Sequence, residues 1–213
     1  SSAVLKAVTH GLTVITGGPG TGKTSIVVAI LRLLVRMGVA TEEIAVATLT
    51  GRAAFRLQET ITGTMAAVAP KGASAPKADG YDATIREMMT TNGPRTIHRL
   101  LSASADGSSF RNNKRSRLRQ KWVIIDESSM IDLELAHRLC EALPEDAHLI
   151  LLGDASQLPP VGAGAPFRDL VHAASTIKSS GFSVTRLTMS YRASEKDPGG
   201  RNIVGVAAKV TAG

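Results

Sequence analysis

A glycine-rich segment follows the first apolar run of the sequence. Residues 17–24 read GGPGTGKT and match the pattern G-x-x-x-x-G-K-[ST]. Glycines let the backbone curl so that its N–H groups point at one phosphate, and a helix that begins there adds its positive end. The motif predicts binding of a nucleoside triphosphate, with Lys23 on the β and γ phosphates and Thr24 on a Mg²⁺ ion. The residues predicted to form the loop are Gly17, Gly18, Pro19, Gly20, Thr21, Gly22, Lys23 and Thr24.

Two carboxylates, Asp126 and Glu127, follow the third apolar run, WVII at residues 122–125. Carboxylates at the end of a buried strand are costly unless a metal or a partner compensates them. Asp126 fits the carboxylate on the Mg²⁺ side of such a site, and Glu127 is placed to polarise an attacking water as general base. Gln157, in a polar segment after a later apolar run, can contact the γ-phosphate and that water. These residues predict hydrolysis, although a simple helix-capping turn after residue 125 is the alternative.

Short apolar runs alternate with helical patterns along the chain. We expect strands over residues 12–16, 44–48, 122–125, 148–152 and 184–189. We expect helices over residues 22–38, 52–59, 96–101, 133–143, 165–173 and 202–210. Continuously apolar strands with intervening helices are typical of an α/β fold, a parallel sheet with helices on both faces. Ligands of such sheets bind at the carboxyl ends of the strands, where the polar segments described above occur.

The positive charge of the chain is concentrated in one region. The 213 residues carry a formal net charge of +7, and residues 71–121 hold 11 basic and 4 acidic side chains. Residues 111–121 alone hold six basic side chains. We interpret this basic segment either as a solvated loop or as an arm that contacts nucleic-acid phosphates. The seven aromatic residues are a small number for a site built on stacked bases.

The composition also bears on the cellular compartment. A hydrophobic fraction of 43% allows a real core and argues against broad disorder. The single cysteine, Cys140, excludes an internal disulfide framework, and we expect it to be a small buried side chain. No apolar run approaches the ~20 residues that span a bilayer, and the N-terminus lacks a signal-peptide pattern. These features predict a cytoplasmic protein.

The motifs together resemble those of one family, the RecD-type helicases of superfamily one. GGPGTGKT, TIHRLL, WVIIDESSM and GDASQLPPVGAGAPFRDL occur in the family's order and spacing, and ATLTGRAAFRL and LTMSYR resemble two further motifs. The likeness covers most of the chain from residue 12 onward, with poor agreement over residues 65–94 and 103–121. It implies a P-loop NTPase of RecA-like fold that uses ATP and Mg²⁺ to move 5′ to 3′ along single-stranded DNA in recombination and repair.

The resemblance also implies roles for particular residues. The catalytic residues that it implies are Lys23, Asp126, Glu127, Gln157 and Arg192. It implies Mg²⁺ binding by Thr24 and Asp126. It also implies that Tyr191 stacks on adenine; the alternative is that Tyr191 is an ordinary aromatic residue at a domain edge. The DNA-contacting residues that it implies are Thr50, Gly51, Arg52, His98 and Arg99, although a structural role for His98 stays open. The implied partners are single-stranded DNA and nuclease or helicase subunits of an exodeoxyribonuclease V-type complex.

The sequence departs from the family pattern in places. Leu49 stands where the family has a proline, and residues 1–10 contain no convincing match to the glutamine that reads adenine. Nothing matches a second RecA-like domain, so we expect residues 1–213 to be one ATP-binding domain of a longer protein, weakly active or inactive alone. Irregular insertions are expected at about 65–95 and 103–121. Alternative interpretations are a conjugative relaxase or other superfamily-one helicase, and a non-catalytic P-loop module.

Overall fold

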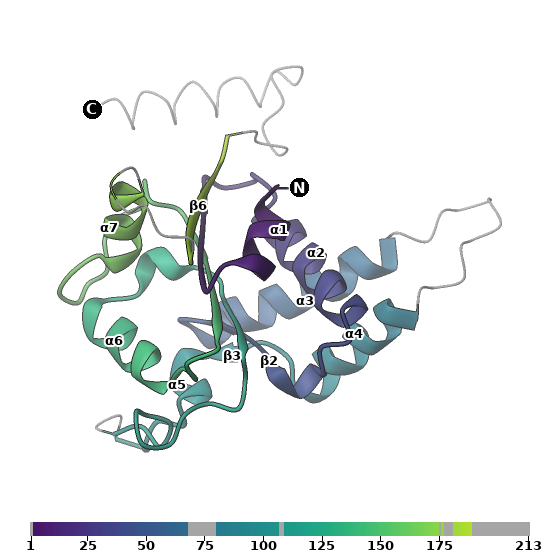
Figure 1. The fold of residues 1–213 in the computed structure, drawn as a ribbon, viewed down its shortest axis with the longest axis horizontal. Coiled ribbons are helices and arrows are strands. Elements are labelled where there is room, and N and C mark those ends of the chain that lie inside the picture. Colours follow the sequence, from purple (N-terminus) through teal and green to yellow (C-terminus); the bar gives the residue numbers. More distant parts are fainter. Residues whose placement is uncertain (1, 68–79, 107–108, 175, 177–180, 189–213) are drawn as a thin grey trace.

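A six-stranded parallel sheet forms the centre of the molecule. The computed structural model describes residues 2–67, 80–106, 109–174, 176 and 181–188. The strands are β1 (Leu12–Gly17), β2 (Ile44–Thr48), β3 (Arg95–Thr96), β4 (Trp122–Ile125), β5 (His148–Gly153) and β6 (Phe182–Leu187). Their order across the sheet is β3-β2-β4-β5-β1-β6, and every neighbouring pair runs parallel. The edges of the sheet are therefore β3 and β6 (Figure 1).

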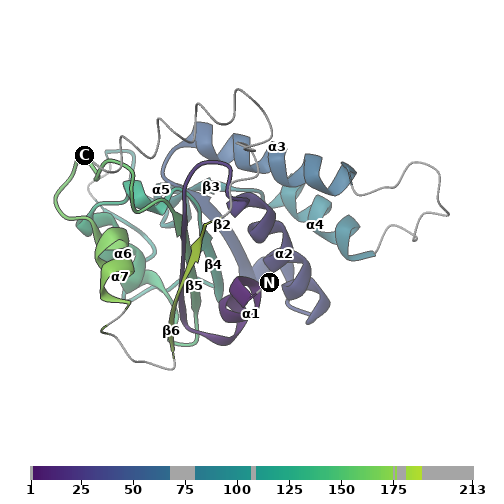
Figure 2. The same ribbon diagram turned by 90° about the horizontal axis from the view of Figure 1, so that it is seen from above.

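Helices cover both faces of this sheet, as predicted. The α-helices are α1 (Ser2–Thr9), α2 (Lys23–Arg36), α3 (Gly51–Ala67), α4 (Gly80–Thr91), α5 (Ile97–Leu100), α6 (Leu133–Ala142) and α7 (Pro166–Ala173). Helices α1 to α4 lie on one face, and α5 to α7 lie on the other (Figure 2). The α/β fold class is confirmed.

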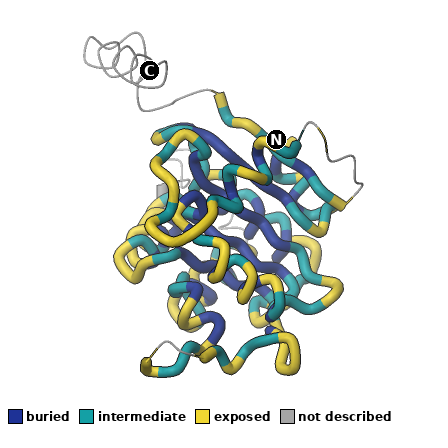
Figure 3. Tube along the Cα trace, turned by 90° about the vertical axis from the view of Figure 1, so that its left-hand side faces the viewer, coloured by how far each residue is buried: buried dark blue, intermediate teal, exposed yellow. Residues whose placement is uncertain are grey.

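The core consists of two apolar clusters, one on each face of the sheet. In β4, Trp122 and Ile124 belong to the cluster with α1 to α4, whereas Val123 and Ile125 belong to the cluster with α5 to α7. The strands are consequently buried on both faces, and Figure 3 shows them as the dark centre of the trace. Burial on both faces explains why the strand sequences are continuously apolar rather than alternating.

The region between β2 and β3 is more regular than predicted. Residues 80–91 form α4, although an irregular insertion was expected over about 65–95, and α3 continues to Ala67 rather than ending at residue 59. Ile85, Met88 and Met89 have helical spacing and are buried in the same cluster as residues of α2 and α3. The adjacent sequence, rich in alanine, proline and glycine, obscured this short pattern. Residues 68–79 lie outside the described residues.

The remaining elements differ less from the predictions. Helix α1 and the two-residue strand β3 were not predicted, and the last strand occurs as β6 two residues earlier than expected. Cys140 is exposed rather than buried, because Leu135, Leu139 and Ala142 form the buried side of α6. The predicted helix at 202–210 lies outside the described residues. Within the described part of the chain, no helix is both long and apolar enough to cross a membrane.

The basic segment, residues 111–121, has no helix and only an isolated bridge, and it lies against the body of the domain. Leu118 is buried in the cluster that includes α6, and its N–H donates to the carbonyl of Ala142 at 2.7 Å. Arg117 pairs with Glu145 at 3.3 Å, and Lys121 pairs with Asp146 at 2.6 Å. Part of the positive charge of this segment is thus neutralised within the protein.

Candidate nucleotide-binding site

Three adjacent strands bring together the predicted catalytic residues that the structure describes. Strands β4, β5 and β1 are neighbours and parallel, so their carboxyl ends meet at one edge of the sheet. The phosphate loop follows β1, Asp126 and Glu127 follow β4, and Gln157 lies in the turn after β5. A cavity of about 820 Å³, called the nucleotide cavity below, is lined by residues 19–24 together with Asp126, Glu127 and Gln157.

The phosphate loop curls around the ammonium group of Lys23. Lys23 Nζ donates to the carbonyl oxygens of Gly17 at 2.7 Å and of Gly18 at 3.1 Å. Gly22 has a φ of 85°, in the left-handed region, and α2 begins at the next residue. A Cβ at Gly17 would lie 2.6 Å from the hydroxyl of Thr21, so this position has no room for a side chain. The loop therefore presents a lysine and a helix N-terminus to the cavity, which suits a phosphate group.

Asp126 is an acid whose ionised form is costly in this protein. The residue is 9% exposed, and burial raises its pKa, as does the negative charge of Glu127. The N–H of Glu127, which donates to Asp126 Oδ1 at 2.9 Å, and the charge of Lys23 lower the pKa in part. A divalent cation would stabilise the ionised carboxylate.

The chemistry of the cavity fits a Mg²⁺ ion. Thr24 lines the same cavity as Asp126. The described residues contain no group of three or more His, Cys, Asp or Glu that could hold a metal alone. Mg²⁺ usually takes one or two protein ligands and completes its shell with water and substrate phosphates, so a single carboxylate and a hydroxyl are adequate.

Glu127 has an unusual backbone conformation. Its φ is 57° and its ψ is 34°, and it is one of two non-glycine residues with positive φ in the described part of the chain. A left-handed conformation at a residue with a Cβ costs about 1–2 kcal/mol. Such strain is concentrated at functional sites, where the surrounding structure maintains it.

Gln157 is held by a hydrogen-bonded turn. Its N–H donates to the carbonyl of Asp154 at 3.1 Å, and its own carbonyl accepts from Arg168 at 2.8 Å. The Asp154 carboxylate accepts from the N–H and the hydroxyl of Ser156 at 3.0 and 2.6 Å. Ser129, two residues after Glu127, donates to Gln157 Oε1 at 3.4 Å and links the turn to the end of β4.

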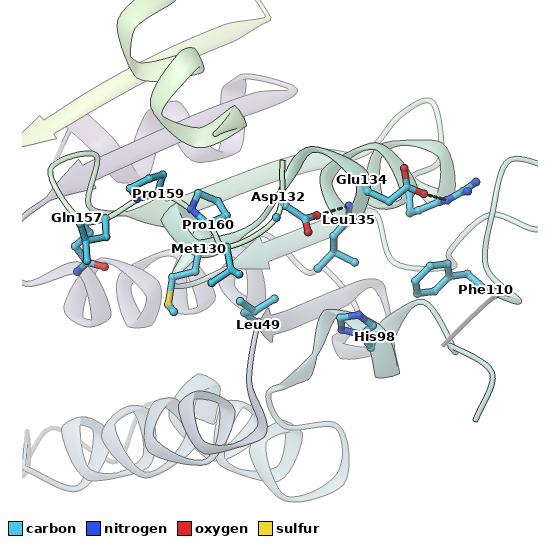
Figure 4. A pocket seen from close by; sticks show the side chains of 14 residues that line it. Leu49, His98, Phe110, Met130, Asp132, Glu134, Leu135, Gln157, Pro159 and Pro160 are labelled. Atoms are coloured by element: carbon cyan, nitrogen blue, oxygen red, sulfur yellow. Dashed lines mark hydrogen bonds and ion pairs between the residues drawn. The ribbon is translucent and has the colours of Figure 1, made fainter. Parts of the chain in front are cut away.

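A groove of about 820 Å³ adjoins the nucleotide cavity, and Gln157 lines both. Figure 4 shows Gln157 at one end of the groove and His98 with Phe110 at the other, with Met130 and Leu49 between them. The His98 ring lies 6.0 Å from that of Phe110. Leu49, which stands in place of the family's proline, contributes an apolar side chain to the groove.

The predicted DNA-contacting residues fall into three places. Thr50 and Arg52 line a cavity of about 510 Å³ together with Asp126 and Glu127, and Gly51 begins α3 between them. Thr50 Oγ1 also caps α3 by accepting from the N–H of Ala53 at 3.2 Å. His98 lies in the groove, whereas Arg99, the next residue, lines another cleft. The structure does not bring these five residues into one site.

Several residues at the site were not identified from sequence. Thr60 of α3 and Leu187 of β6 line the nucleotide cavity, and Asp154 holds the turn of Gln157. Thr60 belongs to no motif, and Leu187 is only the first residue of LTMSYR, so the packing of α3 and β6 beside the loop was needed to place both in the cavity. Asp154 lies within the GDASQ segment, where its short polar side chain before a turn was a usable signal. Tyr191 and Arg192 lie outside the described residues.

Comparison with known proteins identifies the family. A family model described as "AAA domain" matches residues 1–163. The chain belongs to the AAA domain family. RecBCD enzyme subunit RecD of Mycobacterium tuberculosis is 41% identical over 169 residues, covering 78% of this chain and 27% of that protein. ATP-dependent RecD2 DNA helicase of Deinococcus radiodurans is 35% identical over 189 residues, covering 89% of this chain and 21% of that protein.

These relatives confirm the resemblance of this AAA domain to the RecD-type helicases. The chain spans about a quarter of the length of the curated relatives that it matches. Among solved structures, a Pif1 helicase from Candida albicans matches with a TM-score of 0.50 at 19% identity, over 99% of this chain and 42% of that one. This structural likeness bears on the fold alone.

Proposed function

We propose that this AAA domain is the ATP-binding domain of a RecD-type DNA helicase. It couples ATP hydrolysis to 5′ to 3′ movement along single-stranded DNA in recombination and repair. The observation that carries the proposal is the meeting of the phosphate loop with Asp126, Glu127 and Gln157 around one cavity. Similarity to proteins named RecD and RecD2 supports the helicase reaction over a phosphate-binding module without turnover.

Each residue of the nucleotide cavity has a separate role in the proposed hydrolysis of ATP. Lys23 and the backbone of the loop bind the phosphates, and Thr24 and Asp126 hold Mg²⁺. A Mg²⁺ ion held by these two residues would supply positive charge against the negative charge that develops on the phosphates. Glu127 orients and deprotonates the attacking water, which requires that its carboxylate be ionised. We propose that Arg192 adds positive charge at the γ-phosphate and that Tyr191 stacks on the adenine.

Gln157 is the residue that we propose couples hydrolysis to movement. It lines the nucleotide cavity and the adjoining groove. A movement of its side chain on loss of the γ-phosphate would therefore alter the lining of both. The turn that carries it is held by Asp154 and Arg168, which lets a small shift move the turn as a unit.

Single-stranded DNA is the proposed polymer substrate. Thr50, Gly51 and Arg52 supply a hydroxyl, a close backbone approach and a guanidinium, which suit phosphate oxygens. Thr50 and Arg52 line a cavity together with Asp126 and Glu127, and this common cavity supports communication between DNA and the ATP site. We further propose DNA contacts at His98 and Arg99, a cytoplasmic location, and assembly with nuclease or helicase subunits of an exodeoxyribonuclease V-type complex.

Titration of the chain with Mg-ATP tests the first step of this function. We expect binding by the wild-type chain and a loss of affinity of tenfold or more, about 1.4 kcal/mol, in Lys23→Ala. Lys6→Ala removes the same charge from α1 and should leave the affinity unchanged. Equal affinity in the wild-type and Lys23→Ala chains would contradict the proposed site.

Turnover separates the helicase from a binding module. We propose that this domain belongs to a longer protein. That protein should hydrolyse ATP faster when single-stranded DNA is added, and Glu127→Gln should remove nearly all of this activity while retaining Mg-ATP binding. DNA-independent hydrolysis, or none, would exclude the proposed motor function.

A further inference from the structure

A polar cleft lies at the β3 edge of the sheet, away from the nucleotide cavity. Its volume is about 390 Å³, and it is bounded by Gln58 of α3, by residues 89–94 at the end of α4, and by Arg95 and Arg99. Thr90, Thr91 and Asn92 add polar groups, and none of the described residues that line it carries a carboxylate. The lining is thus suited to a negatively charged ligand.

The two arginines of this cleft lack the partners that arginines usually have in folded proteins. Within the described ranges, neither guanidinium has an acidic residue or a hydrogen-bond acceptor of the protein in contact. Arg32 of α2 differs, because it holds Asp82 through two hydrogen bonds of 2.8 and 2.7 Å. Arg95 is partly buried, and burial first and the charge of Arg99 second lower its pKa. An anion between them would offset the repulsion between the two guanidinium groups and would stabilise the charged form of Arg95.

The shape of the cleft is fixed by contacts beneath it. Gln58 Nε2 donates to the carbonyl of Met89 at 2.8 Å, which joins α3 to the end of α4. A Cβ at Gly93 would collide with the same carbonyl, so only glycine permits this close approach. A cleft held in this way is organised before its ligand arrives, which lowers the entropic cost of binding.

The position of the cleft indicates a polymeric ligand rather than a small one. Strand β3 pairs with the end of β2 in the register Ala47–Arg95 and Thr48–Thr96, and Thr50 follows two residues later. Helix α3 contributes Gln58 to the cleft and Arg52 to the cavity beside Asp126. The cleft and the cavity of Thr50 and Arg52 therefore lie along one helix, and a polynucleotide backbone would offer phosphates in series to the arginines of both.

We propose that Arg95 and Arg99 bind backbone phosphate of the single strand and extend its track from Thr50 and Arg52 to the β3 edge. The inference rests on the proposed DNA binding and adds a second contact region with Arg95 as a new member. It also separates Arg99 from His98, which faces the groove instead.

The salt dependence of binding to a fluorescent single-stranded oligonucleotide tests this proposal. The slope of log affinity against log salt should fall by about 0.7 for each phosphate that is no longer neutralised, and thus by about 0.7 to 1.4 in Arg95→Gln/Arg99→Gln. Lys6→Gln/Arg86→Gln removes the same charge from α1 and from an exposed position of α4, and it should retain the wild-type slope. Arg95→Lys/Arg99→Lys keeps the charges and should also retain it, which guards against a folding defect in the glutamine variant.

The outcomes distinguish this inference from the function on which it rests. If the wild-type chain binds the oligonucleotide and Arg95→Gln/Arg99→Gln has the same slope, DNA binding in the cleft is contradicted and the proposed function stays intact. Failure of the wild-type chain to bind any oligonucleotide would overturn both. A thermal shift with inorganic phosphate that Arg95→Gln/Arg99→Gln abolishes, together with an unchanged oligonucleotide slope, would identify a small phosphate ligand and contradict the DNA track.

Discussion

Asp126 carries a buried carboxyl group whose ionised form is unfavourable, and Glu127 has an unfavourable left-handed backbone conformation. Burial raises the pKa of Asp126, and Glu127 occupies the left-handed region beside it. Neither arrangement stabilises the fold, and both place a carboxylate beside the phosphate loop, where we propose that Asp126 holds Mg²⁺ and Glu127 acts as a base. Binding sites commonly sacrifice stability in this way for an arrangement that their ligand needs.

Replacement of Asp126 by asparagine should stabilise the ligand-free chain at neutral pH. The folded-state pKa of Asp126 lies above its ordinary value of 3.8, so the folded protein binds the proton more tightly than the unfolded chain. Stability is therefore lost as pH rises from about 3.8 through the folded pKa, and stays reduced above it. Asp126→Asn removes this loss, and each 1 kcal/mol gained raises the melting temperature by about 2–4 °C.

Thermal unfolding of Asp126→Asn between pH 4 and 8 measures this effect. The gain over wild type should shrink as the pH is lowered toward 3.8. Asp146→Asn is the matched control, because the hydrogen bond from Lys121 lowers the pKa of that exposed acid and its removal should give no gain. A destabilised Asp126→Asn at pH 7 would show that burial is not the dominant influence on this carboxyl group.

Among the elements, α4 determines how α3 is held over the sheet. Arg32 of α2 binds Asp82 of α4 through two of its guanidinium nitrogens, Nε and Nη2, and Gln58 Nε2 of α3 donates to the carbonyl of Met89. Ile85, Met88 and Met89 fill the space between these helices. Because α3 carries Arg52 and Thr60, α4 supports residues of the proposed nucleotide and DNA sites that it does not itself reach.

Ile85→Ala should therefore destabilise the whole domain rather than one surface loop. Ile85 is fully buried, and removal of a large buried aliphatic side chain costs about 2–5 kcal/mol. Urea unfolding should give this decrease in a single transition. Glu87→Ala, on the exposed side of α4, should change the free energy of unfolding by less than about 0.5 kcal/mol. Equal stability of Ile85→Ala and wild type would mean that α4 does not belong to the core.

At the scale of the whole molecule, the positive charges of the basic segment are not equivalent. Arg117 and Lys121 pair with Glu145 and Asp146 beside α6. Within the described residues, the other four basic side chains of the segment have no acidic partner; these are Arg111, Lys114, Arg115 and Arg119. Only these four can neutralise phosphates without first breaking an ion pair.

The two groups should differ in their effect on DNA binding if the segment is a nucleic-acid arm. Changing the four unpaired side chains to glutamine should reduce the salt slope of single-strand binding by up to about 2.8, at about 0.7 for each phosphate. Arg117→Gln/Lys121→Gln should leave the slope unchanged. An unchanged slope in the fourfold variant would assign the segment to a solvated loop, and a reduced slope in the paired variant would contradict the division into paired and unpaired charges.

The sequence by itself determined the local chemistry of this protein. The glycines of residues 17–24, the carboxylates after WVII and the apolar strands depend on short-range backbone and burial preferences, and they predicted the phosphate loop and the α/β class. The tertiary structure alone decided that β4, β5 and β1 are adjacent, that Gln157 borders two cavities, and that His98 and Arg99 face different ones. It also revealed the ion pairs of Arg117 and Lys121. These features depend on strand order and on contacts between residues distant in the chain, which no local pattern encodes.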